Sequence, residues 1–159
     1  MGVNIPNKII VHHSAFLQKA SQLAQINEWH KERGFYQSAL GYFVGYHYLI
    51  AHDGTITQTK NINEEGCHTI GQNLQSIGVC MEGDFTQEMP TAKQEQMLGK
   101  LIVSLCDAHG IPYTAIEPHR KFSSTSCYGK KLGDNYGKIA YLKERIDQLR
   151  QALQAMLSQ

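Results

Sequence analysis

The fold of this chain is decided by a short apolar run that ends in two histidines, KIIVHH (Lys8 to His13). Three consecutive β-branched residues in a run of this length are typical of a buried strand. Successive side chains of a strand point to opposite faces of the sheet, so His12 and His13 cannot both face one site. The sequence therefore predicts a buried strand that directs one of its two histidines at a shared site.

Further strands are expected downstream of this run. GYHYLIA (Gly45 to Ala51) and TITQT (Thr55 to Thr59) flank the turn signal Asp53-Gly54, a pattern typical of a β-hairpin. SIGVCME (Ser76 to Glu82) is the next predicted strand. The segment between them, Lys60 to Gln75, is polar and has no period, so we expect a long surface loop. Loops of this length in small domains are usually functional.

Helical spacing predicts two helices among these strands. The first follows Ser21 and ends at Gly34, a residue that commonly terminates a helix. The second opens where Thr91 and Gln94 are spaced as a capping box, and His109-Gly110 closes it. The apolar residues expected to form its buried stripe are Met97, Leu101, Leu105 and Ala108.

The last segment, residues 138–159, differs in kind. Its large apolar residues fall at alternating steps of three and four: Ile139, Leu142, Ile146, Leu149, Leu153 and Met156. On a helix rich in Lys, Arg and Gln this spacing forms an a/d heptad seam. Two interpretations stay open, a terminal helix packed on the domain and a helix for self-association or partner docking. About three heptads is the lower limit for an independent coiled coil, which favours packing on the domain.

Composition fits one globular domain. The 159 residues are 42% hydrophobic and 18% charged, with a net charge of +1, which indicates neither a nucleic-acid binder nor an acidic tail. No run approaches the roughly 18 apolar residues of a membrane span, and MGVNIPNKII lacks the features of a signal peptide. We therefore expect cytoplasmic synthesis and an α/β fold: a single domain with a central mixed β-sheet flanked by helices, plus a C-terminal amphipathic helix.

The candidate metal ligands come from the eight histidines and four cysteines. His30 and His109 lie near predicted helix C-termini, where a protonated imidazole complements the helix dipole. His119 and Cys127 are separated by seven residues in HRKFSSTSC, a loop long enough to bring both side chains to one metal. Two imidazoles and a thiolate suit Zn²⁺, and three protein ligands leave the fourth tetrahedral position for water. Spacing alone is a weak signal, because His-x7-Cys is not a dedicated metal motif.

The surrounding residues strengthen this prediction. Five blocks follow one another along the chain: IIVHHSA, GYHYLIAHDGTI, GCHTIGQN, SIGVCMEGDF and PHRKFSSTSC. Together they resemble the type-2 N-acetylmuramoyl-L-alanine amidase family, which includes phage endolysins and animal peptidoglycan recognition proteins. The resemblance covers roughly Lys8 to Lys131. It implies a zinc amidase domain over residues 1–137 and leaves residues 138–159 outside as the C-terminal amphipathic helix.

The resemblance also implies roles for individual residues. The family's three ligands to one Zn²⁺ fall on His12, the first histidine of the pair, and on His119 and Cys127. The family's catalytic tyrosine falls on Tyr46. Thr125 stands two residues before the last ligand, where the family carries Lys or Thr, and it is the second catalytic candidate. A neutral threonine cannot replace the electrostatics of a lysine, so we expect Tyr46 to matter more.

Other positions of the resemblance match residues around the substrate cleft or depart from the family pattern. His68 in GCHTIGQN matches a histidine that lines the substrate cleft in many members. Tyr128 stands where the family usually has Pro, and Lys121 stands where it usually has an acidic residue. Some relatives place a carboxylate base on the strand before the second helix, where the resemblance puts Cys80 or Glu82, and of these two only Glu82 is a carboxylate.

The function implied by the resemblance is hydrolysis of the lactyl amide between N-acetylmuramic acid and L-alanine of peptidoglycan. A phage or prophage endolysin would be made in the cytoplasm and act on the cell wall after release, whereas a recycling amidase would cut soluble muropeptides inside the cell. The alternative from another class is a non-catalytic peptidoglycan-binding module, and non-catalytic members typically lose the ligand cysteine that this chain retains. The expected partners are peptidoglycan or muropeptides, with no nucleic acid and no membrane span.

Overall fold

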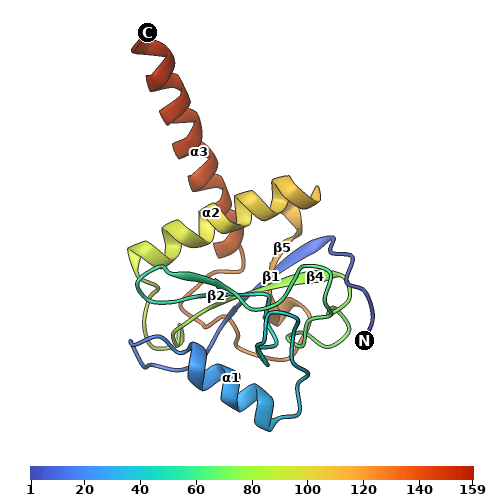
Figure 1. The fold of residues 1–159 in the computed structure, drawn as a ribbon. Coiled ribbons are helices and arrows are strands. Elements are labelled where there is room, and N and C mark those ends of the chain that lie inside the picture. The colour runs from blue at the N-terminus through green and yellow to red at the C-terminus, as the bar shows by residue number, and fades with distance from the viewer.

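The computed structural model describes residues 1–159, and its strands form one sheet of five. Figure 1 shows this sheet with helices on both sides. The elements in chain order are β1 (Lys8–His13), α1 (Leu23–Glu32), β2 (Tyr48–Ile50), β3 (Ile56–Gln58), β4 (Ser76–Met81), α2 (Ala92–His109), the 3-10 turn Tyr113–Ala115, β5 (Ile116–Pro118), the 3-10 turn His119–Lys121 and α3 (Tyr136–Leu157).

The strand order in the sheet is β3-β2-β4-β1-β5. The strand that carries the two histidines, β1, pairs in parallel with both β4 and β5, and β2 pairs in parallel with β4. Only the hairpin of β2 and β3 is antiparallel. This arrangement confirms the predicted α/β class, with a central mixed sheet, flanking helices and a C-terminal helix. It also confirms the hairpin, whose strands are shorter than predicted.

Helices α2 and α3 cover one face of the sheet, where the main core lies. Ile9 and Val11 of β1 and Val79 of β4 are fully buried there, against apolar side chains of α2. The predicted capping box at the start of α2 is present, because the Thr91 side chain and the Gln94 side chain each accept a backbone N–H of the other residue. The cap fixes the start of the helix, and burial of its apolar face stabilises the rest.

The predicted buried stripe of α2 is partly wrong. The apolar side chains of α2 that are buried in the main core are Leu98, Ile102, Leu105 and Cys106. Of the predicted residues, Leu105 is buried, but Ala108 is exposed. Met97 and Leu101 are only partly buried at the edge of the core. Apolar residues adjoin at positions 97–98 and 101–102, so the sequence permits two stripes one residue apart, and the packing against the sheet selects the second.

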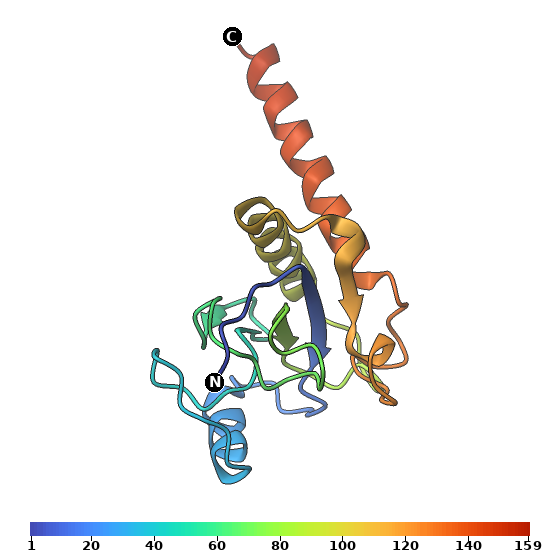
Figure 2. The same ribbon diagram turned by 90° about the vertical axis from the view of Figure 1, so that its right-hand side faces the viewer.

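The other face of the sheet is covered by α1 and the long loops, which lie on the opposite side from α2 in Figures 1 and 2. Ile26 of α1 packs there with Leu49 of β2 and Cys80 of β4. His12 stands opposite Cys80 in the β1–β4 register and therefore faces this side. His13 points to the α2 face, where its Nδ1 accepts the N–H of Phe85 at 3.1 Å. The prediction that the two histidines face opposite sides is confirmed.

The C-terminal helix α3 packs on the domain through its first turns only. Gly137 and Ala140 are buried, and Gly99 of α2 comes so close to the backbone of Ala140 that a Cβ at position 99 would lie 2.7 Å from its carbonyl oxygen. From Ile146 onward every residue is exposed, and the end of the helix stands clear of the sheet in Figures 1 and 2. None of the helices has the length and apolarity that crossing a membrane requires.

Candidate metal centre and active site

The three predicted ligands come together at the C-terminal edge of β1. Val11 pairs with Pro118 in the parallel β1–β5 register, so the residues that follow them lie close together: His12, still in β1, and His119, just past the end of β5. The loop that follows brings Cys127 back to the same point. The ligand atoms of these three residues all lie within 4.8 Å of one another. Strand register therefore positions two ligands, and a loop supplies the third.

The distances within this group fit zinc. The Sγ atom of Cys127 lies 3.7 Å from Nδ1 of His12. A tetrahedral zinc with bonds of about 2.3 Å to sulfur and about 2.0 Å to nitrogen holds such atoms roughly 3.5 Å apart. The rings of His12 and His119 lie 4.6 Å apart between their centroids, tilted by 54°. Two imidazoles and one thiol in this geometry are a donor set that suits zinc and leaves a fourth coordination position.

Burial sets the protonation states of the group. It lowers the pKa of His12 well below its usual value, and the neighbouring His68 and His119 lower it further. Burial also lowers the pKa of His119, so both imidazoles are neutral, the form that binds metals. The pKa of the Cys127 thiol is raised to about 12 by burial, although the N–H of His13 donates a hydrogen bond to Sγ at 3.4 Å. Loss of the thiol proton is therefore coupled to the arrival of a cation.

A chain of hydrogen bonds on the side of the ring away from Cys127 fixes the orientation of His12. Because Nδ1 of His12 is turned toward Cys127, its Nε2 faces away and lies 3.0 Å from Nδ1 of His68. With a metal on Nδ1, Nε2 of His12 would carry the proton and donate a hydrogen bond to Nδ1 of His68. Nε2 of His68 is then the protonated nitrogen, 3.4 Å from Oγ of Ser76, and that hydroxyl donates to the Gln72 carbonyl at 2.7 Å.

Two glycines leave room for the His68 ring. A Cβ at Gly66 would lie 2.5 Å from Cδ2 of His68, and a Cβ at Gly78 would lie 2.6 Å from the same atom. The ring thus fits between the loop and β4, and its position is set by backbone on both sides. The observed contact of His68 is with His12, whereas its part in substrate binding stays a prediction. Sequence reasoning missed this contact, because it joins residues 56 positions apart.

Tyr46 lies beside the metal group, in the segment just before β2. Its ring centroid is 5.0 Å from that of His12. Burial raises the pKa of Tyr46 well above its usual value, and the thiols of Cys80 and Cys127 raise it further. The phenol is therefore protonated and able to donate a hydrogen bond. The structure brings the predicted catalytic tyrosine to the predicted ligands.

His30 supports the segment that carries Tyr46. Its Nδ1 accepts the N–H of Gly45 at 3.0 Å, and its ring lies 5.6 Å from the Tyr46 ring. Burial lowers the pKa of His30 to about 4. The interpretation of His30 as a protonated partner of the helix dipole is therefore wrong. Its side chain turns inward from α1, where the neutral imidazole accepts a backbone hydrogen bond.

Arg120 holds the loop that contains the third ligand. Its guanidinium bonds to the Asp134 carboxylate at 2.6 Å and donates to the carbonyls of Gly129 at 2.7 Å and Leu132 at 2.6 Å. Its backbone N–H donates to the carbonyl of Cys127 at 3.0 Å. Arg120 stands at the start of the loop and bonds to four residues of its later part, Cys127 among them, so it holds the loop closed. The sequence marks this residue as part of a motif but does not reveal this role.

The remaining predicted residues have other partners. Thr125 is exposed, and its Oγ1 accepts the N–H of Cys127 at 3.2 Å, so the observed contact of its hydroxyl is with the ligand loop. The Glu82 carboxylate accepts the N–H of Gln22 at 2.9 Å, next to the start of α1. Burial raises the pKa of Glu82. It anchors α1 to the sheet and is not one of the three residues of the candidate metal group.

Known proteins resemble this chain in sequence and in fold. Residues 2–130 match the family described as N-acetylmuramoyl-L-alanine amidase. The endolysin of Escherichia phage T7 is 30% identical over 128 residues, which cover 75% of this chain and 78% of that protein. Peptidoglycan-recognition protein SC2 of Drosophila melanogaster is 25% identical over 125 residues, covering 77% and 68%. The solved structure of the N-acetylmuramoyl-L-alanine amidase LysC from Clostridium intestinale superposes with a TM-score of 0.71 at 30% identity, covering 83% of this chain and 84% of that one.

The matched region contains the whole sheet and all three members of the candidate metal group, and it ends before α3 begins. Fold, motif order and site geometry therefore agree with the sequence match. The chain belongs to the N-acetylmuramoyl-L-alanine amidase family.

Proposed function

We propose that this chain is a zinc-dependent amidase that hydrolyses the amide between the lactyl group of N-acetylmuramic acid and L-alanine in peptidoglycan. The observation that carries the proposal is the convergence of His12, His119 and Cys127, with their ligand atoms within 4.8 Å and Tyr46 beside them. Membership of the family and the likeness to phage endolysins support the substrate class.

His12, His119 and Cys127 would hold one zinc ion as two neutral imidazoles and one thiolate. Zinc bound there would supply Lewis-acid chemistry, polarising the scissile carbonyl and lowering the pKa of a water nucleophile. The chain's own part is to present the ligands in fixed orientation. His68 orients His12 through the 3.0 Å contact, and Arg120 fixes the loop around Cys127.

Tyr46 is the side chain that we assign to the reacting amide. Its protonated hydroxyl donates a hydrogen bond to the substrate oxygen, where negative charge develops as the carbonyl carbon becomes tetrahedral. Thr125 contributes less, because it is neutral and its hydroxyl already accepts the N–H of Cys127. His68 contributes to the reaction by orienting His12. It is half-buried, so its exposed part can also contact the substrate at the edge of the site.

We infer that the protein acts as an endolysin, made in the cytoplasm and acting on the cell wall after release, with peptidoglycan as its partner. The likeness to the endolysin of phage T7 supports this inference. The catalytic domain would span residues 1–137 and the C-terminal helix residues 138–159. Retention of Cys127 next to both histidines favours an enzyme over a non-catalytic binding module.

The experiment that tests the proposal compares metal content with activity. The purified protein should contain about one zinc per chain and should release new amino termini of L-alanine from peptidoglycan, and a strong chelator should abolish this release. Cys127→Ala should lose both zinc and activity, whereas Tyr46→Phe should keep zinc and lose most of its turnover. Full activity of Cys127→Ala, or of the chelated protein, would refute zinc dependence. Bound zinc without any amide cleavage would support the binding module instead.

A further inference from the structure

The heptad seam of α3 lies open along its whole length. Each of its six residues, Ile139, Leu142, Ile146, Leu149, Leu153 and Met156, is between 44% and 71% exposed. Six large apolar side chains in one stripe form a surface that a monomeric protein does not usually leave in water. The seam is separate from the metal group, and nothing in the proposed amidase reaction uses it.

The seam points away from the domain. Gly137 and Ala140 face the core, and Tyr141 stacks on Tyr113 at 5.7 Å between ring centroids. At 3.6 residues per turn, Ile146 lies about 180° around the helix from Gly137. A second molecule can therefore approach the seam without meeting the sheet, α1 or α2 of the first.

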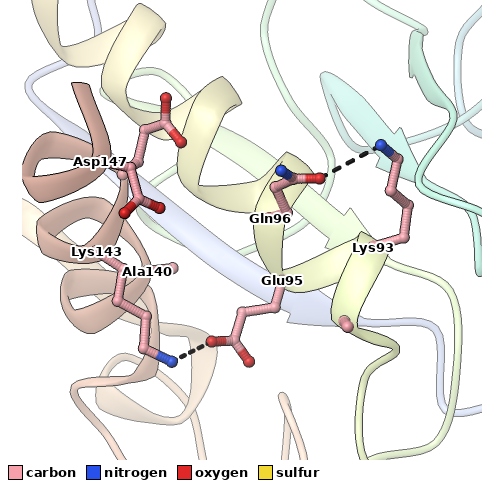
Figure 3. Close-up of a pocket in the computed structure, with 8 residues that line it drawn as sticks. Lys93, Glu95, Gln96, Ala140, Lys143 and Asp147 are labelled. Atoms are coloured by element: carbon pink, nitrogen blue, oxygen red, sulfur yellow. Dashed lines mark hydrogen bonds and ion pairs between the residues drawn. The ribbon is translucent and has the colours of Figure 1, made fainter. Parts of the chain in front are cut away.

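The hollow between α2 and α3 lies on a different side of the helix. It has a volume of about 640 Å³, and Ala140, Lys143 and Asp147 line it from α3, as Figure 3 shows. Glu95 and Lys93 line it from α2, and Lys143 pairs with Glu95 across it. No seam residue contributes to this hollow. The contacts that hold α3 on the domain thus leave the seam free.

We propose that the seam is a dimer interface, and that its occupant is the α3 helix of a second copy of this chain. Ile139 and Ile146 occupy a positions, and Leu142 and Leu149 occupy d positions. Ile at a with Leu at d favours two-stranded coiled coils over higher oligomers. Each of the six seam side chains exposes on the order of 100 Å². Six side chains from each of two copies therefore bury on the order of 1,200 Å² in total, which is the lower end of the range for stable interfaces.

The charges beside the seam favour a second copy over an anionic lipid surface. The e and g positions carry Lys138, Lys143, Arg145 and Arg150. Each has a carboxylate partner in the same chain: Lys138 with Glu117, Lys143 with Glu95, Arg145 with Asp107 and Arg150 with Asp147. These partners offset the repulsion between like charges of two copies. Residues 151–159 have no charged side chain, so the most exposed part of the seam has no cations to attract anionic lipid.

The charge pattern gives the dimer a distinctive salt dependence. Residual repulsion between the cations of two copies is screened by salt, and apolar burial is not weakened by it. Association should therefore strengthen as sodium chloride rises from 0.05 to 0.5 M. Attraction to an anionic membrane would weaken over the same range.

Sedimentation equilibrium of the full chain tests this proposal. The mass should rise from 17.9 kDa toward twice that value as the concentration rises from about 1 µM to about 1 mM, and more steeply at high salt. The variant L149K/L153K should stay monomeric at every concentration. Its matched control, Q148K/Q151K, adds the same charges to exposed positions outside the seam and should dimerise like the parent.

Because Leu149 and Leu153 are 70% and 58% exposed in a free part of the helix, their replacement leaves the domain intact. Circular dichroism and peptidoglycan cleavage, both unchanged, should confirm this. A parent protein that stays monomeric up to 1 mM would overturn the proposal, and so would a control that loses the dimer together with L149K/L153K. Binding to phosphatidylglycerol vesicles that weakens with salt, with no dimer in solution, would overturn it in favour of a lipid surface.

Discussion

Replacing His68 by leucine should weaken zinc binding while leaving the fold in place. Nδ1 of His68 lies 3.0 Å from Nε2 of His12, and it would accept a hydrogen bond from the N–H at this nitrogen if His12 held a metal through Nδ1. Leucine has a volume close to that of imidazole but offers no acceptor. Nε2–H of His12 would then keep only the more distant Oγ1 of Thr69, at 3.5 Å, and the ring would lose the shorter bond that sets its orientation.

The size of the effect follows from this one bond. A hydrogen bond to a charged group contributes about 1.5–3 kcal/mol, and an imidazole on a metal carries part of the metal's charge. At about 1.4 kcal/mol per tenfold change, the dissociation constant for zinc should rise roughly 10- to 100-fold. His68→Asn is the matched control, because its amide oxygen can take the place of Nδ1 as the acceptor. Its affinity should stay within a few-fold of the parent.

Competition with a chromophoric chelator at constant pH measures both affinities, and a melting curve of each metal-free variant checks the fold. Parent-like zinc affinity in His68→Leu would refute the argument that His68 orients the ligand. An equal loss in the leucine and asparagine variants would also refute it, since the acceptor would then be irrelevant. Loss of cleavage with unchanged zinc affinity would instead assign His68 to the substrate.

Three further outcomes follow from the structure. Ile102 of α2 is fully buried against the sheet, so Ile102→Ala should lower the free energy of unfolding by about 2–5 kcal/mol in chemical denaturation. A loss below about 1 kcal/mol would contradict its place in the core. Burial lowers the pKa values of His30 and His47 to about 4, below the unfolded value of 6.5, so their contribution to stability is complete above about pH 6.5 and is lost as the pH falls toward 4. For His47 the full loss of unfolding free energy is about 3 kcal/mol. A melting temperature that stays constant from pH 7 to pH 4 would contradict this prediction. Arg120→Lys keeps the positive charge but loses the guanidinium group that donates to two carbonyls. Proteolysis within residues 123–134 should therefore become faster, and zinc affinity should fall. An unchanged rate of proteolysis would show that the loop does not need the guanidinium.

Local pattern predicted much of this fold. The run from Lys8 to His13 forms β1 with the predicted bounds, and the capping box of α2 forms as expected. Both depend on neighbouring residues only, namely on strand alternation and on a side chain that meets a nearby N–H. The buried stripe of α2 was misplaced by one residue, because two overlapping apolar stripes are equal in sequence and only the packing distinguishes them.

The candidate site was likewise predictable from local motifs but not from its tertiary contacts. The motif blocks predicted which residues converge, and the β1–β5 register gives the reason for two of them, because it pairs Val11 with Pro118, the residues just before His12 and His119. The supporting contacts were not predictable, since the His68–His12 bond and the Arg120 bonds depend on how loops fold over the sheet. The inward turn of His30 was missed for a related reason, because the sequence places the residue near a helix end but does not show what it faces.

Mass spectrometry of digested peptidoglycan tests the central claim most directly. The zinc-loaded protein should release stem peptides that begin with a free L-alanine amino group, and it should leave glycan strands whose muramic acid ends in a lactyl carboxylate. Tyr46→Phe with its zinc retained should yield far less of both products in the same time. Stem peptides that remain attached to muramic acid, or cleavage at a peptide or glycosidic bond instead, would contradict the account.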